Sequence, residues 1–165
     1  MQKCLQATAL MAGAWRDSGP VAVRLLFSVL LLAAVSQGAA GAEMIGQGGY
    51  VTDGDTFELA LPDHMVKIRI CGIDAPESGE PGSREAWAAL SAMVHRRPVR
   101  CVQVGQEPGT VCDHHSKPTN RDRIVAQCFV GDQDIAAALV RDGHACDWQK
   151  FSGGYYHRLT GGKVC

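Results

Sequence analysis

The sequence predicts an α+β domain that is mainly β, and three observations lead to this prediction. Apolar residues alternate at a period of two in several short segments, which is typical of half-buried strands. Two other segments carry apolar residues at helical spacing. Their order is a strand hairpin, a helix, two strands and a second helix. This order favours an OB-type five-stranded Greek-key barrel with two helices.

The first predicted unit is a β-hairpin. Segment 50–61 ends in alternating apolar residues, and the same alternation returns in segment 66–70, with basic residues on the opposite face. A Pro-Asp-His sequence at 62–64 supplies the turn between the two strands. Cys71 is interpreted as a strand residue with a buried thiol. Segment 72–82 is rich in Gly, Pro and acidic residues, so we expect a loop there.

The first helix is expected to follow this loop. Ser83 is its predicted N-cap, and an apolar stripe at helical spacing consists of Ala86, Leu90 and either Met93 or Val94. The helix must end before Pro98, because proline disfavours the helical conformation of the residue before it.

Two more strands and a helix complete the predicted domain. Segments 99–104 and 124–130 have the composition of strands, and the polar segment 105–122 between them is predicted to be a long loop. Asp134 is the predicted N-cap of a second helix, Ile135–Arg141.

The first 42 residues have the layout of a secretory signal peptide. Arg24 precedes an apolar run at 25–35, and small residues then end in Ala42, so cleavage is expected after Ala42. The run has about 11 residues, whereas a spanning helix needs about 20, so an uncleaved anchor is the weaker alternative. The stretch before Arg24 is long for such a signal, which suggests a translation start nearer Arg24, for example at Met11. The predicted organisation is therefore a leader, 1–42, and one secreted or periplasmic domain, 43–165.

Charge and cysteine content restrict the function of this domain. It contains 13 Lys and Arg against 16 Asp and Glu, a net charge of −3 with neutral histidines. That balance excludes a protein that coats nucleic acid through its overall charge, so any such contact needs a local site. Six of the seven cysteines lie in the domain, and an even number in an exported domain favours disulfides. No C-x-x-C is present, which argues against a zinc ribbon.

Disulfide pairing is predicted only in part. Cys101 and Cys128 lie on two strands that should be neighbours, so they are the first predicted pair. Cys146 is expected to pair with either Cys165 or Cys112.

The chemistry is predicted from one group of charged residues. Asp53 and Asp55 are two residues apart and would share one face of a strand. If the hairpin forms, Asp55 and Asp74 meet at one end of the sheet. Carboxylates and carbonyl oxygens in one place suit a hard cation such as calcium or magnesium rather than zinc.

The remaining members of this group suit a phosphate. Arg69 and Arg123, on neighbouring strands, can hold phosphate oxygens and stabilise charge that develops on them. Glu77 is then available to orient or deprotonate a water molecule. Each part alone has an ordinary explanation, such as an Asp-Gly turn or a solvated strand arginine. Together and in this order they favour metal-assisted phosphodiester hydrolysis.

Two motifs resemble the signature motifs of the thermonuclease family, named for staphylococcal nuclease: VTDGDT at 51–56 and IRICGIDAPE at 68–77. The resemblance covers residues 50–145. It implies an OB-type barrel and calcium-dependent endonuclease activity on DNA and RNA. It also implies site residues by position: Asp55, Asp74 and the Ala75 carbonyl for calcium, Asp53 close by, Glu77 for water, and Arg69 and Arg123 for the phosphate.

Three features depart from the family pattern. Arg121 stands where a tyrosine would contact the nucleotide, and Asp122 replaces a glycine at a tight turn, where it could pair with Arg123. Residues 112–115 resemble a metal-ligand cluster but lack a second ligand pair, so they are interpreted as an exposed polar loop. Residues 151–165 have no helical periodicity, so the family's C-terminal helix is predicted to be missing.

The favoured function is an exported calcium-dependent nuclease with single-stranded DNA or RNA as substrate. It would act as a monomer without a stable protein partner, and it would meet the membrane only through the signal peptide. One alternative is a catalytically degenerate OB-fold module that binds nucleic acid or another polyanion without cleaving it. Another is a calcium-stabilised structural module of a cell-envelope assembly.

Overall fold

The computed structural model describes residues 43–165. The leader, with the predicted signal peptide, its cleavage point and the alternative start, lies outside the described residues. Within 43–165, no helix combines the length and the apolar character needed to cross a membrane.

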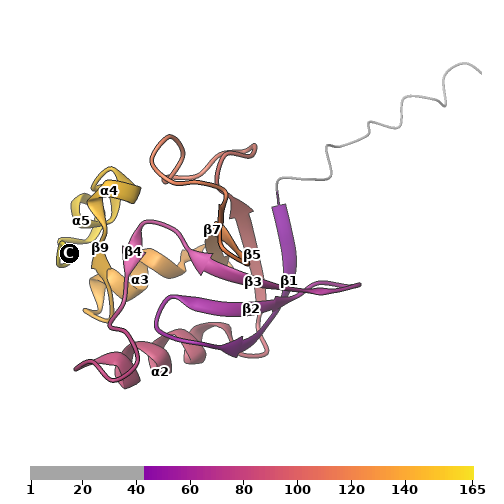
Figure 1. Ribbon diagram of the computed structural model, residues 1–165, viewed down its shortest axis with the longest axis horizontal. Coiled ribbons are helices and arrows are strands. Elements are labelled where there is room, and N and C mark those ends of the chain that lie inside the picture. The colour runs from indigo at the N-terminus through magenta and orange to yellow at the C-terminus, as the bar shows by residue number, and fades with distance from the viewer. Residues whose placement is uncertain (1–42) are drawn as a thin grey trace, which may run out of the picture. The chain divides into compact units, whose positions relative to one another are not determined.

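The centre of the domain is a closed barrel of five strands (Figure 1). They are β1 (Glu43–Val51), β2 (Thr56–Ala60), β3 (Met65–Ile70), β5 (Pro98–Gln103) and β7 (Arg123–Val130). Neighbours in the order β3-β2-β1-β5-β7 are antiparallel, and a parallel pairing of β3 with β7 closes the barrel. The α+β, mainly β class and the OB-type five-stranded barrel are therefore confirmed.

Four short strands extend this frame. β6 (Thr119–Asn120) and β8 (Gln133–Asp134) both pair with β7, while β4 (Ile73–Asp74) pairs with β9 (Cys146–Asp147) in a separate two-stranded sheet. The β4–β9 pairing fixes the segment that follows β3, and the carboxylate-bearing residue Asp74 lies within it.

Helix α2 (Ser83–Val94) covers one end of the barrel with its apolar face (Figure 1). Ala86, Leu90 and Val94 are fully buried in the core, as their spacing predicted. Burial of a leucine or valine side chain stabilises a fold by about 1.5–3 kcal/mol. The N-cap prediction was wrong by one residue: the N-cap is Gly82, at φ 89°, and Ser83 begins the helix without a side-chain cap. Glycine fits there because a left-handed backbone disfavours other residues.

Helix α3 (Ile135–Arg141) has the cap that the sequence predicted. The Asp134 carboxylate accepts a hydrogen bond from the Ala137 N–H at 3.1 Å. Buried α3 residues, including Ile135 and Leu139, pack into the barrel core.

The C-terminal segment differs from the prediction, because residues that lack helical periodicity form two short helices, α4 (Gln149–Ser152) and α5 (Tyr155–Thr160). The fully buried Asp147 carboxylate organises them: it accepts hydrogen bonds from the Ser152 hydroxyl and from the His157 N–H, the latter at 2.7 Å. The fully buried Tyr156 joins α5 to the core. No long C-terminal helix follows within residues 43–165, which thus contain four helices rather than the two expected.

Three disulfides link segments that are distant in sequence: Cys71–Cys112, Cys101–Cys128 and Cys146–Cys165. The second is the predicted bridge, because Cys101 and Cys128 face each other in the β5–β7 register. The third is one of the two alternatives for Cys146. The interpretation of Cys71 as a thiol was wrong, because the loop 105–118 folds back over the end of β3 and brings Cys112 to it.

Candidate active site

The turn between β1 and β2 carries the first two carboxylates. Asp53 and Asp55 lie in this turn and not on a strand as predicted, and the Asp55 N–H donates to Asp53 Oδ1 at 3.1 Å. Gly54 lets the turn approach its neighbours closely. A Cβ at Gly54 would lie 2.6 Å from the Ala75 Cβ and 2.7 Å from the Ala86 Cβ. The turn is therefore packed against both the Ala75 loop and helix α2.

The Asp55 carboxylate is buried and fully engaged. Its Oδ1 accepts from the Thr56 hydroxyl at 3.0 Å, and its Oδ2 accepts from the Ala75 N–H at 3.1 Å. The same Oδ2 forms an ion pair with Arg69 Nη2 at 2.9 Å. Burial raises the pKa of Asp55 to about 7, although the Arg69 charge lowers it, and the nearby Asp53 raises it further. A cation beside this carboxylate would offset the burial.

Arg69 joins the two predicted metal-binding carboxylates. Its Nη2 lies 2.9 Å from Asp55 Oδ2 and 3.3 Å from Asp74 Oδ1. Its guanidinium also donates to two backbone carbonyls, those of Ile70 at 2.9 Å and Ile73 at 3.0 Å. These four contacts hold a side chain that is only 12% exposed. The guanidinium is thereby fixed between the end of β3 and the start of β4.

Arg123 reaches the same place from the parallel strand. The β3–β7 register pairs Arg69 with Val125, so Arg123 begins its strand beside β3. Arg123 Nη1 donates to Thr56 Oγ1 at 3.4 Å, and Thr56 in turn donates to Asp55. Thr56 thus connects the second arginine to the buried carboxylate. Sequence reasoning quoted this threonine within the motif but gave it no role.

Glu77 is separate from these contacts. It is exposed on the loop after β4, and its backbone N–H donates to Glu80 Oε2 at 2.9 Å. No polar contact of its side chain with Asp55, Arg69 or Asp74 is present in the described domain.

The donors suit a hard cation. Asp55 and Asp74 each place a carboxylate oxygen within 3.3 Å of the same guanidinium nitrogen, so the two carboxylates lie close together. Two carboxylates with carbonyl and water oxygens match calcium or magnesium, whereas zinc prefers nitrogen and sulfur ligands. Across residues 43–165, no cluster of three or more His, Cys, Asp or Glu side chains has ligand geometry.

The altered β6–β7 turn is arranged differently from the prediction. Arg121, not Asp122, has the left-handed backbone, with φ 58°. Asp122 Oδ2 pairs with Lys67 Nζ at 3.0 Å, and no hydrogen bond or ion pair joins it to Arg123 in the described domain. Asp122 was expected to pair with Arg123 and so to compete with phosphate. In the structure its ion-pair partner is Lys67 instead.

Residues 112–115 do not form a metal cluster. Cys112 is in a disulfide, and the Asp113 carboxylate accepts hydrogen bonds from the Gly105 N–H and from the Thr110 N–H and hydroxyl, all within 2.9 Å. These hydrogen bonds engage both oxygens of the Asp113 carboxylate and order the loop.

A cavity of about 500 Å³ opens beside Arg69. Aromatic and basic side chains line it, among them Trp148, Phe151, His115, Lys117 and Lys150. The Trp148 and Phe151 rings meet edge to face with centroids 4.6 Å apart. Sequence reasoning missed this cavity, because its aromatic residues come from the α4 region and Lys117 comes from the loop held by Cys112.

The protein is therefore an OB-type barrel in which two carboxylates, Asp55 and Asp74, and two arginines, Arg69 and Arg123, are joined by direct contacts and through Thr56. Residues 67–160 match the family described as Staphylococcal nuclease homologue, which is more than half of the chain. The chain belongs to this family.

Several known proteins are similar to this chain at low sequence identity. An "Uncharacterized endonuclease" of Haemophilus influenzae is 25% identical over 129 residues, which cover 78% of this chain and 66% of that protein. The "Succinoglycan biosynthesis protein ExoI" of Rhizobium meliloti is 29% identical over 151 residues, 84% and 70% of the two chains. A "Micrococcal nuclease" of Shigella flexneri is 25% identical over 126 residues, 73% and 65%. The chain thus spans just under two thirds of the length of the two named nucleases.

Proposed function

We propose that this protein is an exported calcium-dependent nuclease that hydrolyses phosphodiester bonds of DNA and RNA by metal-assisted attack of water. The observation that carries this proposal is the buried Asp55 carboxylate, joined through Arg69 to Asp74 and through Thr56 to Arg123. Family membership and the two similar proteins named as nucleases support it.

In this proposal Asp55, Asp74 and the Ala75 carbonyl hold the calcium ion, with Asp53 close to it. Calcium, when bound, supplies positive charge that neutralises phosphate oxygens. The raised pKa of Asp55 supports a cation at this carboxylate, because the buried charge lacks sufficient compensation from Arg69 alone.

The arginines and Glu77 act on the phosphodiester. Arg69 and Arg123 lie on paired strands, so their guanidinium groups bind oxygens of one phosphate and stabilise its developing charge. Glu77 accepts a proton from the attacking water at its carboxylate. Its exposed position leaves that carboxylate open to a water molecule positioned by the substrate.

The cavity beside Arg69 supports a single-stranded substrate. Trp148 and Phe151 offer aromatic surface on which an unstacked base can lie, and Lys117 and Lys150 suit a neighbouring phosphate. Export is supported by the layout of residues 1–42 and by the three disulfides, which form in oxidising compartments. The protein acts as a monomer in this proposal.

The test is hydrolysis of denatured DNA by the oxidised protein, first with calcium and then with a chelator. We expect calcium-dependent cleavage, and a loss of about 100-fold or more in kcat for Glu77→Gln, since a general base contributes about 10²–10⁴. Glu107→Gln changes an exposed glutamate of the loop 105–118 and is the matched control. Equal activity of the two variants would remove Glu77 from the mechanism.

A second candidate is binding of nucleic acid without cleavage. The observations that favour it are the lack of contact between Glu77 and the carboxylate cluster and the presence of Arg121 in the third motif. If the folded protein binds denatured DNA in the presence of calcium but does not cleave it, this candidate is supported.

A further inference from the structure

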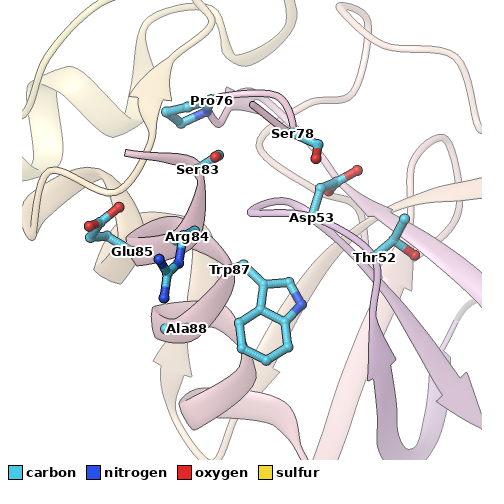
Figure 2. A pocket seen from close by; sticks show the side chains of 9 residues that line it. All are labelled: Thr52, Asp53, Pro76, Ser78, Ser83, Arg84, Glu85, Trp87 and Ala88. Carbon is cyan, nitrogen blue, oxygen red and sulfur yellow. The ribbon is translucent and has the colours of Figure 1, made fainter. Parts of the chain in front are cut away.

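A second cavity, of about 540 Å³, lies between the first turns of α2 and the turn that carries Asp53 (Figure 2). Its lining includes Asp53, Pro76, Ser78, Arg84, Glu85 and Trp87. We call it the α2 cavity. It shares no lining residue with the cavity beside Arg69, so the two are separate spaces.

The α2 cavity adjoins the proposed site directly. Asp53 lines it, and Asp53 Oδ1 accepts the hydrogen bond from the Asp55 N–H. Pro76 and Ser78 also line it, and they are the two chain neighbours of Glu77. A group bound in the α2 cavity is therefore adjacent to a reaction at Asp55 and Glu77.

Trp87 provides a fixed aromatic surface in this cavity. Its indole Nε1 donates to the Val51 carbonyl at 2.8 Å, so the polar atom of the side chain already has its partner. The residue is nevertheless 44% exposed, and Figure 2 shows its ring between α2 and the segment of Thr52 and Asp53. An indole that is fixed by its Nε1 hydrogen bond and open on the cavity side is suited to stacking with a flat group.

The charged side chains that line the α2 cavity favour binding of a neutral group over binding of a phosphate. Asp53 and Glu85 contribute two carboxylates against the single guanidinium of Arg84. The cavity beside Arg69 has the opposite balance, since Lys117 and Lys150 line it. Hydroxyl groups, such as that of Ser78, add hydrogen-bonding partners for the edge of a base.

We propose that the α2 cavity binds the base of one of the two nucleotides joined by the scissile phosphodiester, stacked on Trp87. The base of the other nucleotide occupies the cavity beside Arg69. This inference rests on the proposed nuclease function and extends it, since it makes Trp87 a specificity-determining residue. Bases held in two separate cavities cannot remain stacked on each other, which is why the substrate is single-stranded.

The test uses short single-stranded oligonucleotides with one cleavable linkage, in which the base on either side of that linkage is removed. For the wild type, removal of either base should lower kcat/KM about 5- to 150-fold, the range of one base–aromatic stack. Trp87→Ala should lower kcat/KM for the intact oligonucleotide by a similar factor. On the substrate that lacks the base stacked on Trp87, the Trp87→Ala variant should be as fast as the wild type. This equality also shows that the variant is folded.

Two further variants complete the comparison. Trp87→Phe keeps an aromatic ring and should recover most of the activity on the intact oligonucleotide. Tyr50→Ala removes an aromatic side chain of β1 that is 65% exposed and lines neither cavity, so it should leave the abasic dependence unchanged. If Trp87→Ala retains the wild-type sensitivity to both abasic positions, the inference is overturned.

A binding measurement separates this inference from the nuclease proposal. The chain has three tryptophans, so Trp15→Phe with Trp148→Phe leaves Trp87 as the only fluorescent indole. Saturable quenching by the intact oligonucleotide, absent for one abasic form, supports the α2 cavity even if no phosphodiester is cleaved. Cleavage without such quenching supports the nuclease and overturns the cavity assignment.

Discussion

Replacement of Asp55 by asparagine should stabilise the calcium-free protein and remove its response to calcium. The side chain is buried, and burial raises the pKa of its carboxyl group from 3.8 to about 7. Between these two pH values the folded protein holds the proton more tightly than the unfolded chain. The free energy of unfolding therefore falls as pH rises through this range, and the loss is complete above about pH 7.

The size of the effect follows from the same shift. Each pKa unit corresponds to about 1.4 kcal/mol, so an ionised Asp55 lowers the free energy of unfolding by roughly 4 kcal/mol at most. Asparagine has no charge and can still accept from the Ala75 N–H while donating to Thr56. It loses the ion pair with Arg69, which keeps Asp74 and two carbonyls as partners. We therefore expect a net gain of about 2 kcal/mol near pH 8.

The assay is urea unfolding of the wild type and Asp55→Asn with a chelator, at pH values from about 5 to about 8. The difference between the two proteins should grow as pH rises. With calcium at about 100 times its dissociation constant, the wild type should gain about 3 kcal/mol and Asp55→Asn much less. Asp132→Asn, at an exposed aspartate between β7 and β8, is the matched control and should show neither effect.

Two results would refute this reasoning. If Asp55→Asn is less stable than the wild type across the whole pH range without calcium, the hydrogen bonds and the Arg69 ion pair outweigh the burial of charge. If calcium stabilises both proteins equally, Asp55 is not a ligand.

Three further predictions concern the parts that position the site. Gly54→Ala should cost about 1–3 kcal/mol in urea unfolding and lower kcat, because the new methyl group overlaps its packed neighbours. Asp147→Ala should cost about 3 kcal/mol and speed proteolysis near α4 and α5, because it removes the acceptor of one buried and one partly buried hydrogen bond. Replacing Cys71 and Cys112 together by serine should lower stability by about 4 kcal/mol. It should also raise KM, because the bridge anchors the loop 105–118, which carries Lys117.

Part of the site was predictable because its members are close in sequence or on paired strands. The hairpin of β2 and β3 brings Asp55 next to Arg69, and Asp74 and Ala75 follow β3 after a short connection. Their proximity needs only strand periodicity and a tight turn. Glu77 makes no polar side-chain contact with this group in the described domain, since its loop position depends on hydrogen bonds of its own. The roles proposed for all of these residues stay predictions until they are tested.

Residue patterns alone predicted four of the five barrel strands, the apolar stripe of α2, the Asp134 cap of α3 and the Cys101–Cys128 bridge. They missed β1, of which only Tyr50 and Val51 lie in a predicted strand. Each of the predicted features depends on local periodicity, a local cap, or two strands that must be neighbours. The folded structure alone revealed the Cys71–Cys112 bridge, the two short C-terminal helices and the two cavities next to the site. These features depend on the path of long loops and on one buried carboxylate, Asp147. Such contacts join segments far apart in the chain, and no periodicity within either segment encodes where they meet.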